Sequence, residues 1–266
     1  MYNRKTESLI KKFDVLSKSN SKSISYKYDE KIKCIEELID IQGKIASYFV
    51  GLWNAPGIAI KQYRELLPLL FISFHKNFFL FFSAYKLTIQ GLYGPARPLM
   101  RNIFEALMVS KFCFLAEDPA ILKKWDSGQT IYFTNTILKK IIDPNPQPFF
   151  IFWGIICDQS HASKTSMQFT LELTEEDETS GVLGNLAVLA VLLECNYHLL
   201  NSLLITPELY NMAKYYISRY SFRENEFGLP DLRKSAHSMF KKNRKFLSSD
   251  SISLIWTYKR KWSLKV

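Results

Sequence analysis

The sequence contains few of the residues that interrupt helices, because its 266 residues include only ten glycines and ten prolines. It also lacks segments in which β-branched and polar residues alternate, as they do in half-buried strands. Apolar residues make up 47% of the chain, which excludes a disordered protein and suffices for a sizeable core. These features predict an all-α fold: a single bundle of about eight to ten helices with basic N- and C-terminal extensions.

Closely spaced cysteines are absent as well. The four cysteines, at positions 34, 113, 157 and 195, form no Cys-x-x-Cys pair, which argues against a zinc clip or a dithiol redox centre. Such spacing is typical of reduced thiols in the cytosol. The first twenty residues contain no apolar run as long as that of a signal peptide. Together these absences predict a cytoplasmic protein.

No apolar run is both long enough and free of charge to span a bilayer. Residues 66–85 approach the required length, but the polar triplet 75–77 (HKN) lies in their middle. Residues 186–200 are fewer and include Glu194 and His198. Since a charge at the bilayer centre is costly, both segments are expected to be central helices of a bundle rather than transmembrane spans.

The common signatures of catalysis are missing. The chain has no G-x-x-x-x-G-K-[ST], G-x-G-x-x-G or G-x-S-x-G motif, so nothing supports nucleoside-triphosphate hydrolysis, dinucleotide binding or serine-hydrolase chemistry. It has no H-E-x-x-H motif, and the pair Glu194 and His198 lacks a third ligand for a metal ion. We therefore predict neither a metal nor a cofactor.

Positive charge is concentrated at the two ends of the chain. Residues 1–33 carry nine Lys/Arg against four Asp/Glu, and residues 233–266 carry ten against one. Because the whole chain has a net charge of +10, the residues between these segments are slightly acidic. We divide the chain into a basic polar leader (1–29), a helical core domain (30–229) and a basic C-terminal helix with an aromatic tail (230–266).

The C-terminal segment mixes cations with aromatic residues, a composition suited to phosphates and stacked bases. An anionic partner is expected there, either nucleic acid (RNA rather than DNA) or an acidic protein, and the alternative is a solvated tail without a partner. Its candidate substrate-binding residues are Lys241, Lys242, Arg244, Lys245, Lys259, Arg260 and Lys261.

Breaks in the helical pattern divide the core domain. The Ser-rich segment 17–25 is typical of a mobile leader or a hinge, and residues 173–181 (LTEEDETSG) of an acidic surface loop. Residues 251–266 alternate loosely, which is compatible with a β-hairpin arm or a docked tail. The expected helices cover residues 29–53, about 60–91 with a possible kink at Pro68, 95–116, 119–142, 149–163, 182–205, 207–222 and 231–246.

One expected core helix carries three charges in a row. Arg97, Arg101 and Glu105 are spaced four residues apart and therefore form a single stripe. One interpretation is an Arg–Glu pair that fixes the register of the helix. The other is a polar cleft in which the arginines bind an anionic substrate. A buried arginine needs a carboxylate or several acceptors, and Glu105 supplies one partner.

A second polar group follows an apolar run, in the segment CDQSHAS (157–163). His161 suits general acid–base chemistry near neutral pH, with Asp158 as a neighbouring substrate-binding residue. The structural alternative is a hydrogen-bonded core histidine.

The segment SFHKNFFLFFSAYKLTIQGLYGPARPLMRNIFEALM (73–108), followed by CDQSHAS, resembles a bacterial all-helical family of unknown function. Arg101 and Glu105 match the L-x-R-x-x-x-E helix of that family and His161 matches its later histidine, whereas Asp158 departs from the serine of the pattern. Such proteins are broadly similar to HEPN domains, helical RNase modules of toxin–antitoxin and phage-defence systems. The Arg-x4–6-His motif of HEPN domains is not matched here, since Arg233 and His237 are one residue too close.

Two hypotheses follow. The set of Arg101, Glu105 and His161, together with the basic, aromatic ends of the chain, favours a nucleic-acid-directed protein, and the HEPN-like resemblance favours a metal-independent RNase effector. In that hypothesis the fold brings Arg101 and His161 together: His161 would be the general base, Arg101 would stabilise the phosphorane and Glu105 would orient Arg101. The alternative is a non-enzymatic helical interaction module that docks a partner protein or nucleic acid. The aromatic-rich surface allows a homodimer, and membrane binding is not expected.

Overall fold

The computed structural model describes residues 8–53, 72–116, 119–133, 137, 147–160, 175–204 and 238. All regular secondary structure in these residues is helical, which confirms the all-α prediction for this part of the chain. The elements are α1 (Leu9–Lys27), α2 (Asp29–Trp53), the π-helical turn η1 (Ile72–Lys76), α5 (Asn77–Ile89), α6 (Tyr93–Ala116), α7 (Pro119–Asp126), α8 (Gln147–Ser160) and α10 (Glu175–Leu204).

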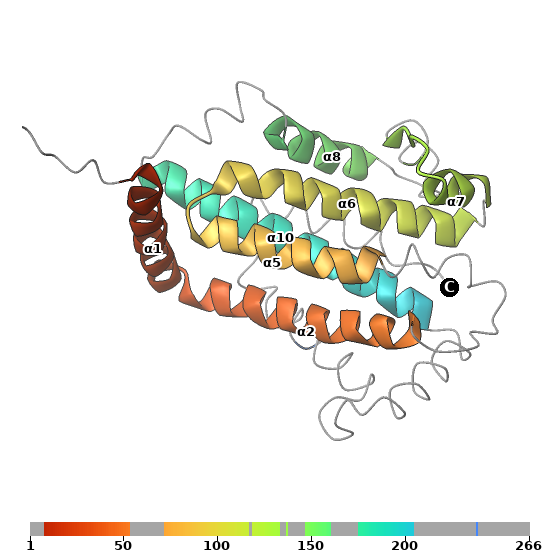
Figure 1. The fold of residues 1–266 in the computed structure, drawn as a ribbon, viewed down its shortest axis with the longest axis horizontal. Coiled ribbons are helices and arrows are strands. Elements are labelled where there is room, and N and C mark those ends of the chain that lie inside the picture. The colour runs from red at the N-terminus through yellow and green to blue at the C-terminus, as the bar shows by residue number, and fades with distance from the viewer. Residues whose placement is uncertain are drawn as a thin grey trace, which may run out of the picture.

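Helices α2, α5, α6 and α10 run side by side and form the body of the molecule (Figure 1). Helix α8 lies along the outer side of α6, and α1 stands across the end of the bundle where the α5–α6 turn lies. Large apolar side chains from several of these helices meet in one core, among them the fully buried Ile35, Phe74, Phe81, Met100 and Phe104. Each helix turns its apolar side toward its neighbours, and these buried side chains form one continuous core.

The turn between α5 and α6 depends on a glycine. Gly91 has a φ of +81°, a conformation that residues with a side chain rarely adopt. The N–H of Leu92 donates to the carbonyl of Leu87 at 2.8 Å, which closes the end of α5. The Asn20 side chain of α1 donates to the carbonyl of Gln90 at 3.3 Å, so α1 is attached at this turn.

Asn185 of α10 fixes the same turn from the other side. Its side-chain amide donates to Thr88 Oγ1 and to the carbonyl of Tyr93, each at 3.2 Å. Near it, a Cβ on Gly181 would lie 2.5 Å from the Tyr93 ring, so only glycine allows this approach. The start of α10 is thereby packed on the start of α6.

Three expectations about the local structure were wrong. The Ser-rich segment 17–25 is not a hinge but part of α1, because Ile24 is buried in the bundle and holds this helix in place. Most of the expected acidic loop belongs to α10, which begins at Glu175 and is anchored by the contact of Gly181 with Tyr93. Helix α7 ends at Asp126, far short of residue 142, because Gly128 with a φ of +69° ends it.

His75, Lys76 and Asn77 interrupt the most apolar segment, and they face different directions because neighbouring residues on a helix point about 100° apart. Lys76 is exposed, His75 is half-buried and Asn77 is fully buried, so Asn77 is the one of the three that faces the bundle centre. None of the described helices is both long and apolar enough to cross a bilayer. Cys34, Cys113 and Cys195 are buried thiols, Cys157 is half-buried, and none of the four forms a disulfide.

Candidate functional site

The charged stripe on α6 is present, and its outer part is an ion pair. Arg101 Nε lies 3.0 Å from Glu105 Oε1, one helical turn away, and the two side chains are 27% and 32% exposed. The pairing of these residues is therefore confirmed, while their catalytic roles stay predictions. In addition, the Arg101 guanidinium lies 4.9 Å from the centre of a Trp153 ring on α8. This contact fixes the arginine against an aromatic surface.

That surface is an aromatic cluster between α6 and α8. Phe104 lies 5.1 Å from Phe152 and 6.1 Å from Trp153, between ring centres. Phe133, from the segment after α7, is 4.4 Å from Trp153. Offset and edge-on contacts at these separations are favourable and rigid. The cluster therefore holds the Trp153 ring under Arg101.

Arg97 occupies a different environment. It is only 6% exposed and lies against α10, where a Cβ on Gly184 would come within 3.2 Å of its Nη2. Burial lowers the pKa of Arg97 to about 10, so the guanidinium remains charged in neutral solution. Among the residues that the structure describes, no carboxylate or hydrogen-bond acceptor pairs with it. Arg97 is a buried cation that a bound anion would stabilise.

The remaining predicted site residues are not brought to this stripe by anything that the structure describes. His161 lies outside the described residues, as do Lys241, Lys242, Arg244, Lys245, Lys259, Arg260 and Lys261. Asp158 lies on α8, but its side chain is not among those that the structure describes. Within the described part of the chain, no three His, Cys, Asp or Glu side chains are grouped so that they could hold a metal ion.

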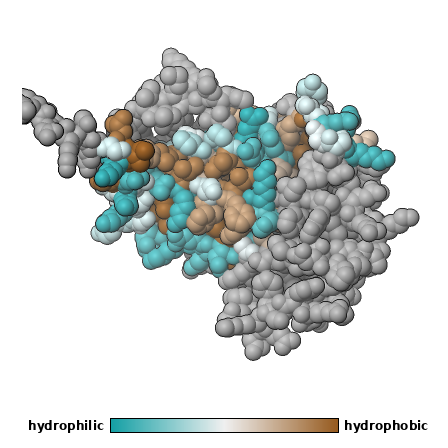
Figure 2. All heavy atoms as spheres, viewed as in Figure 1, coloured by the Kyte–Doolittle hydropathy of each residue, from teal (hydrophilic) through white to brown (hydrophobic). Residues whose placement is uncertain are grey.

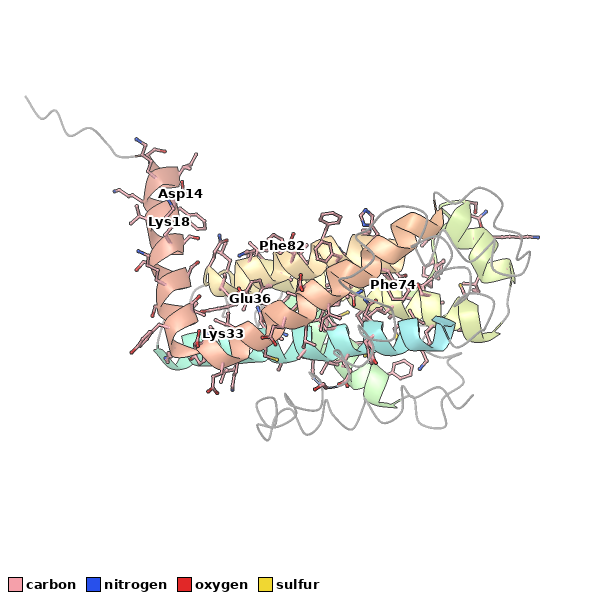
Figure 3. The ribbon with its side chains drawn as sticks, turned by 90° about the horizontal axis from the view of Figure 1, so that it is seen from below. Asp14, Lys18, Lys33, Glu36, Phe74 and Phe82 are labelled. Atoms are coloured by element: carbon pink, nitrogen blue, oxygen red, sulfur yellow. The ribbon has the colours of Figure 1, made fainter. Side chains whose placement is uncertain are left out.

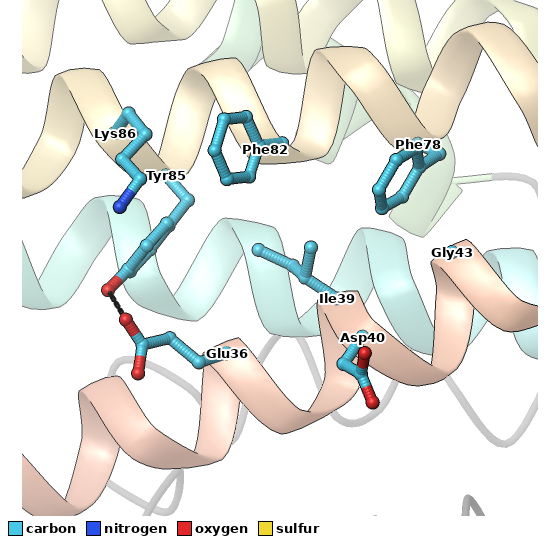
Figure 4. Close-up of a pocket in the computed structure, with 8 residues that line it drawn as sticks. All are labelled: Glu36, Ile39, Asp40, Gly43, Phe78, Phe82, Tyr85 and Lys86. Atoms are coloured by element: carbon cyan, nitrogen blue, oxygen red, sulfur yellow. Dashed lines mark hydrogen bonds between the residues drawn. The ribbon is translucent and has the colours of Figure 1, made fainter.

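A groove that sequence analysis missed lies between α2 and α5 (Figure 4). Its volume is about 520 Å³, within the range of ligand-binding pockets. One wall, from α2, contributes two exposed carboxylates, and the other, from α5, contributes aromatic rings. The lining residues are Glu36, Ile39, Asp40, Gly43, Phe78, Phe82, Tyr85 and Lys86.

The polar groups of the groove are ordered by contacts across it. The Tyr85 hydroxyl donates to Glu36, and burial of the tyrosine together with this bond raises the pKa of Tyr85. The Lys86 ammonium lies 5.4 Å from the ring centres of both Phe82 and Tyr85. The aromatic wall therefore already attracts a cation of the chain itself, as the quadrupole of such rings predicts.

Gly43 gives the groove its shape. A Cβ at this position would lie 2.7 Å from the Phe78 ring, closer than real contacts allow, so the glycine makes room for the ring. Phe82, which lines the groove, and Phe79, which does not, are both exposed on α5, and Figure 2 shows apolar surface on this face of the molecule. Carboxylate, ring and apolar surface thus adjoin one another on the α2–α5 face.

The sequence contained a weak signal for this groove. Glu36 and Asp40 are four residues apart, as are Phe78 and Phe82, so each pair shares one face of its helix. What the sequence could not indicate is that these faces of two separate helices lie opposite each other.

Comparison of the chain with models of protein families, with curated proteins and with solved structures found no match. The resemblance to a HEPN-like bacterial family therefore stays a prediction, and the function has to be argued from the site.

Proposed function

We propose that this protein is a non-enzymatic helical interaction module whose α2–α5 groove binds a basic segment of a partner protein. The observation that carries the proposal is the pairing of two carboxylates with an aromatic wall in a groove of about 520 Å³. A lysine or arginine side chain satisfies both walls, because its charged head faces Glu36 and Asp40 while its aliphatic stem lies on Phe78 and Phe82.

The position of Lys86 supports the choice of a cation. Its ammonium lies over Phe82 and Tyr85 at the edge of the groove, where an incoming ammonium or guanidinium would find the same rings. An anionic ligand would instead face two exposed carboxylates, which disfavours it. The groove is open and its carboxylates are exposed, so we expect a modest affinity that weakens with salt.

Neutralising the acidic wall tests the proposal. A synthetic peptide with the sequence IWTYKRKWSLKV, taken from residues 255–266, serves as a basic and aromatic probe. We expect Glu36→Gln with Asp40→Asn to weaken its binding at least about tenfold, measured by fluorescence polarisation. The control is Glu37→Gln, which removes an exposed carboxylate of α2 that does not line the groove.

The proposal fails if the double variant binds the peptide as tightly as the wild type. It also fails if a peptide with every Lys and Arg replaced by Gln binds equally well, because binding would then not depend on the cations. Phe82→Ala separates the two walls: we expect it to reduce affinity without changing the salt dependence, since it removes a ring and no charge.

A second candidate function is binding of a phosphate-bearing ligand, RNA first, at the α6 stripe. The buried and still charged Arg97 favours it, because this cation has no anionic partner in the described residues. Arg101, one turn further along, would meet the same ligand. The RNase hypothesis adds His161 as a base, and it remains a proposal because that residue lies outside the described part of the chain.

The effect of inorganic phosphate and of short RNA on the melting temperature tests this second candidate function. If the stripe binds phosphate groups, both should raise the melting temperature of the wild type and leave that of Arg97→Met unchanged. Metal-free cleavage of RNA by the wild type but not by His161→Ala would extend the result from binding to catalysis. A wild type that responds to neither ligand excludes the stripe as an anion site.

A further inference from the structure

Helix α1 has an apolar face that the described part of the chain does not cover. Leu9, Phe13 and Leu16 are 82%, 50% and 53% exposed. At about 100° per residue these three side chains fall within roughly 60° of one another, so they form one face. Lys11 and Lys18 lie on the opposite side of the helix by the same count. Helix α1 is therefore amphipathic, with its apolar side in water.

The same face attaches α1 to the bundle further along. Ile24 and Asn20 share the phase of Phe13, and there Ile24 is buried while Asn20 bonds to the carbonyl of Gln90. The N-terminal half, with Asp14 and Lys18, stands clear of the bundle on the side where Phe82 lies (Figure 3). The apolar face of this half therefore lies on the same side as the exposed rings of α5, and the two surfaces form a corner.

We infer that a second copy of this chain covers this face. In the resulting homodimer the N-terminal halves of the two α1 helices pack against each other, antiparallel, about a twofold axis. Each helix lies in the corner formed by α1 and α5 of the other copy. This inference rests on α1 and not on the ligand proposed for the α2–α5 groove, although the docked helix also covers Phe82, which lines that groove.

The position of the bundle excludes a parallel pair. The apolar face of α1 points to the side on which its own bundle lies, so a parallel partner would place a second bundle in the same space. An antiparallel partner places the two bundles at opposite ends of the helix pair. The lysines of each α1 then lie on the outer sides of the pair, where their charges do not meet.

The size of the patch also favours reciprocal pairing. A few exposed apolar side chains offer an area on the order of a few hundred Å², less than the ~800 Å² that each partner of a stable complex buries. In a twofold pair each copy buries its exposed Phe79 and Phe82 in addition to its own α1 face, so the area that each partner buries exceeds that of the α1 face alone.

Sedimentation equilibrium and light scattering of the full chain test the homodimer. We expect the wild type to have twice the mass of the 31.0-kDa chain, and Leu9→Ser with Phe13→Ser to have the mass of one chain. The matched control is Val15→Ser with Tyr26→Ser, which removes two exposed apolar side chains that lie off this face and should leave the homodimer intact. Circular dichroism of each variant verifies that it is folded.

A cross-link tests the antiparallel orientation. In an antiparallel pair centred near Phe13, this residue meets its own copy, whereas Leu9 meets Leu16. Phe13→Cys should therefore form a covalent dimer under mild oxidation much faster than Leu9→Cys. The inference is overturned if the wild type is monomeric, if the serine variants remain dimeric, or if both cysteine variants cross-link at the same rate.

Discussion

Replacement of Phe104 by alanine is expected to lower the free energy of unfolding by about 3–5 kcal/mol. Phe104 is 1% exposed and contacts Phe133, Phe152 and Trp153, so its ring joins α6 to α8 and to the segment after α7. Alanine would leave a cavity among rigid rings that cannot close around it. A loss of this size is a large part of the total stability of a typical domain.

Urea denaturation followed by circular dichroism measures this loss, with Tyr132→Ala as the matched control. Tyr132 is the neighbour of Phe133 in the sequence and is 71% exposed, so its truncation should cost less than about 1 kcal/mol. Equal losses in the two variants would contradict the packing described for the aromatic cluster. Phe104→Ala should also free Trp153, since the ring loses one of the two aromatic side chains that fix it under Arg101.

The class of the fold was predictable from the sequence because helix-breaking residues are rare and the apolar spacing is helical. Helix α6 shows this best: it was expected over residues 95–116 and extends from Tyr93 to Ala116. Its prolines lie near the start, where a missing N–H costs little. Helix α2 was likewise expected over the residues that it occupies, Asp29–Trp53.

The errors have a common physical cause, which is that distant contacts decided the local structure. The acidic residues after position 174 resemble a surface loop on composition, yet the contact of Gly181 with Tyr93 extends α10 through most of them. The Ser-rich half of α1 has poor helix propensity, yet burial of Ile24 holds it helical. Neither contact can be recognised in a local window, since propensity is only a weak prior.

The candidate sites also differ in whether local sequence or distant packing forms them. The ion pair of Arg101 and Glu105 was predictable because both residues belong to one helix and helical geometry alone places them together. The burial of Arg97 depends on which side of α6 meets Gly184, and the groove depends on α2 lying beside α5. Such sites require the packing of segments far apart in the sequence.

Replacement of Arg97 by methionine is expected to raise the free energy of unfolding by about 1–3 kcal/mol, against the usual direction of core substitutions. The wild type buries a charged guanidinium without an anionic partner in the described residues, and it bears the full cost of removing that charge from water. Methionine retains a long flexible side chain of similar shape and removes the charge.

Arg101→Met is the matched control, because Arg101 lies one turn away on the same helix but has Glu105 and the Trp153 ring as partners. A partly exposed ion pair contributes little, so this variant should lose about 1 kcal/mol or less. Urea midpoints of the two variants should therefore move in opposite directions. If Arg97→Met instead destabilises the protein, Arg97 has an anionic partner within the folded chain and cannot serve a phosphate-bearing ligand. If it stabilises the protein and also abolishes the response to phosphate, the chain retains a costly buried charge because a ligand uses it.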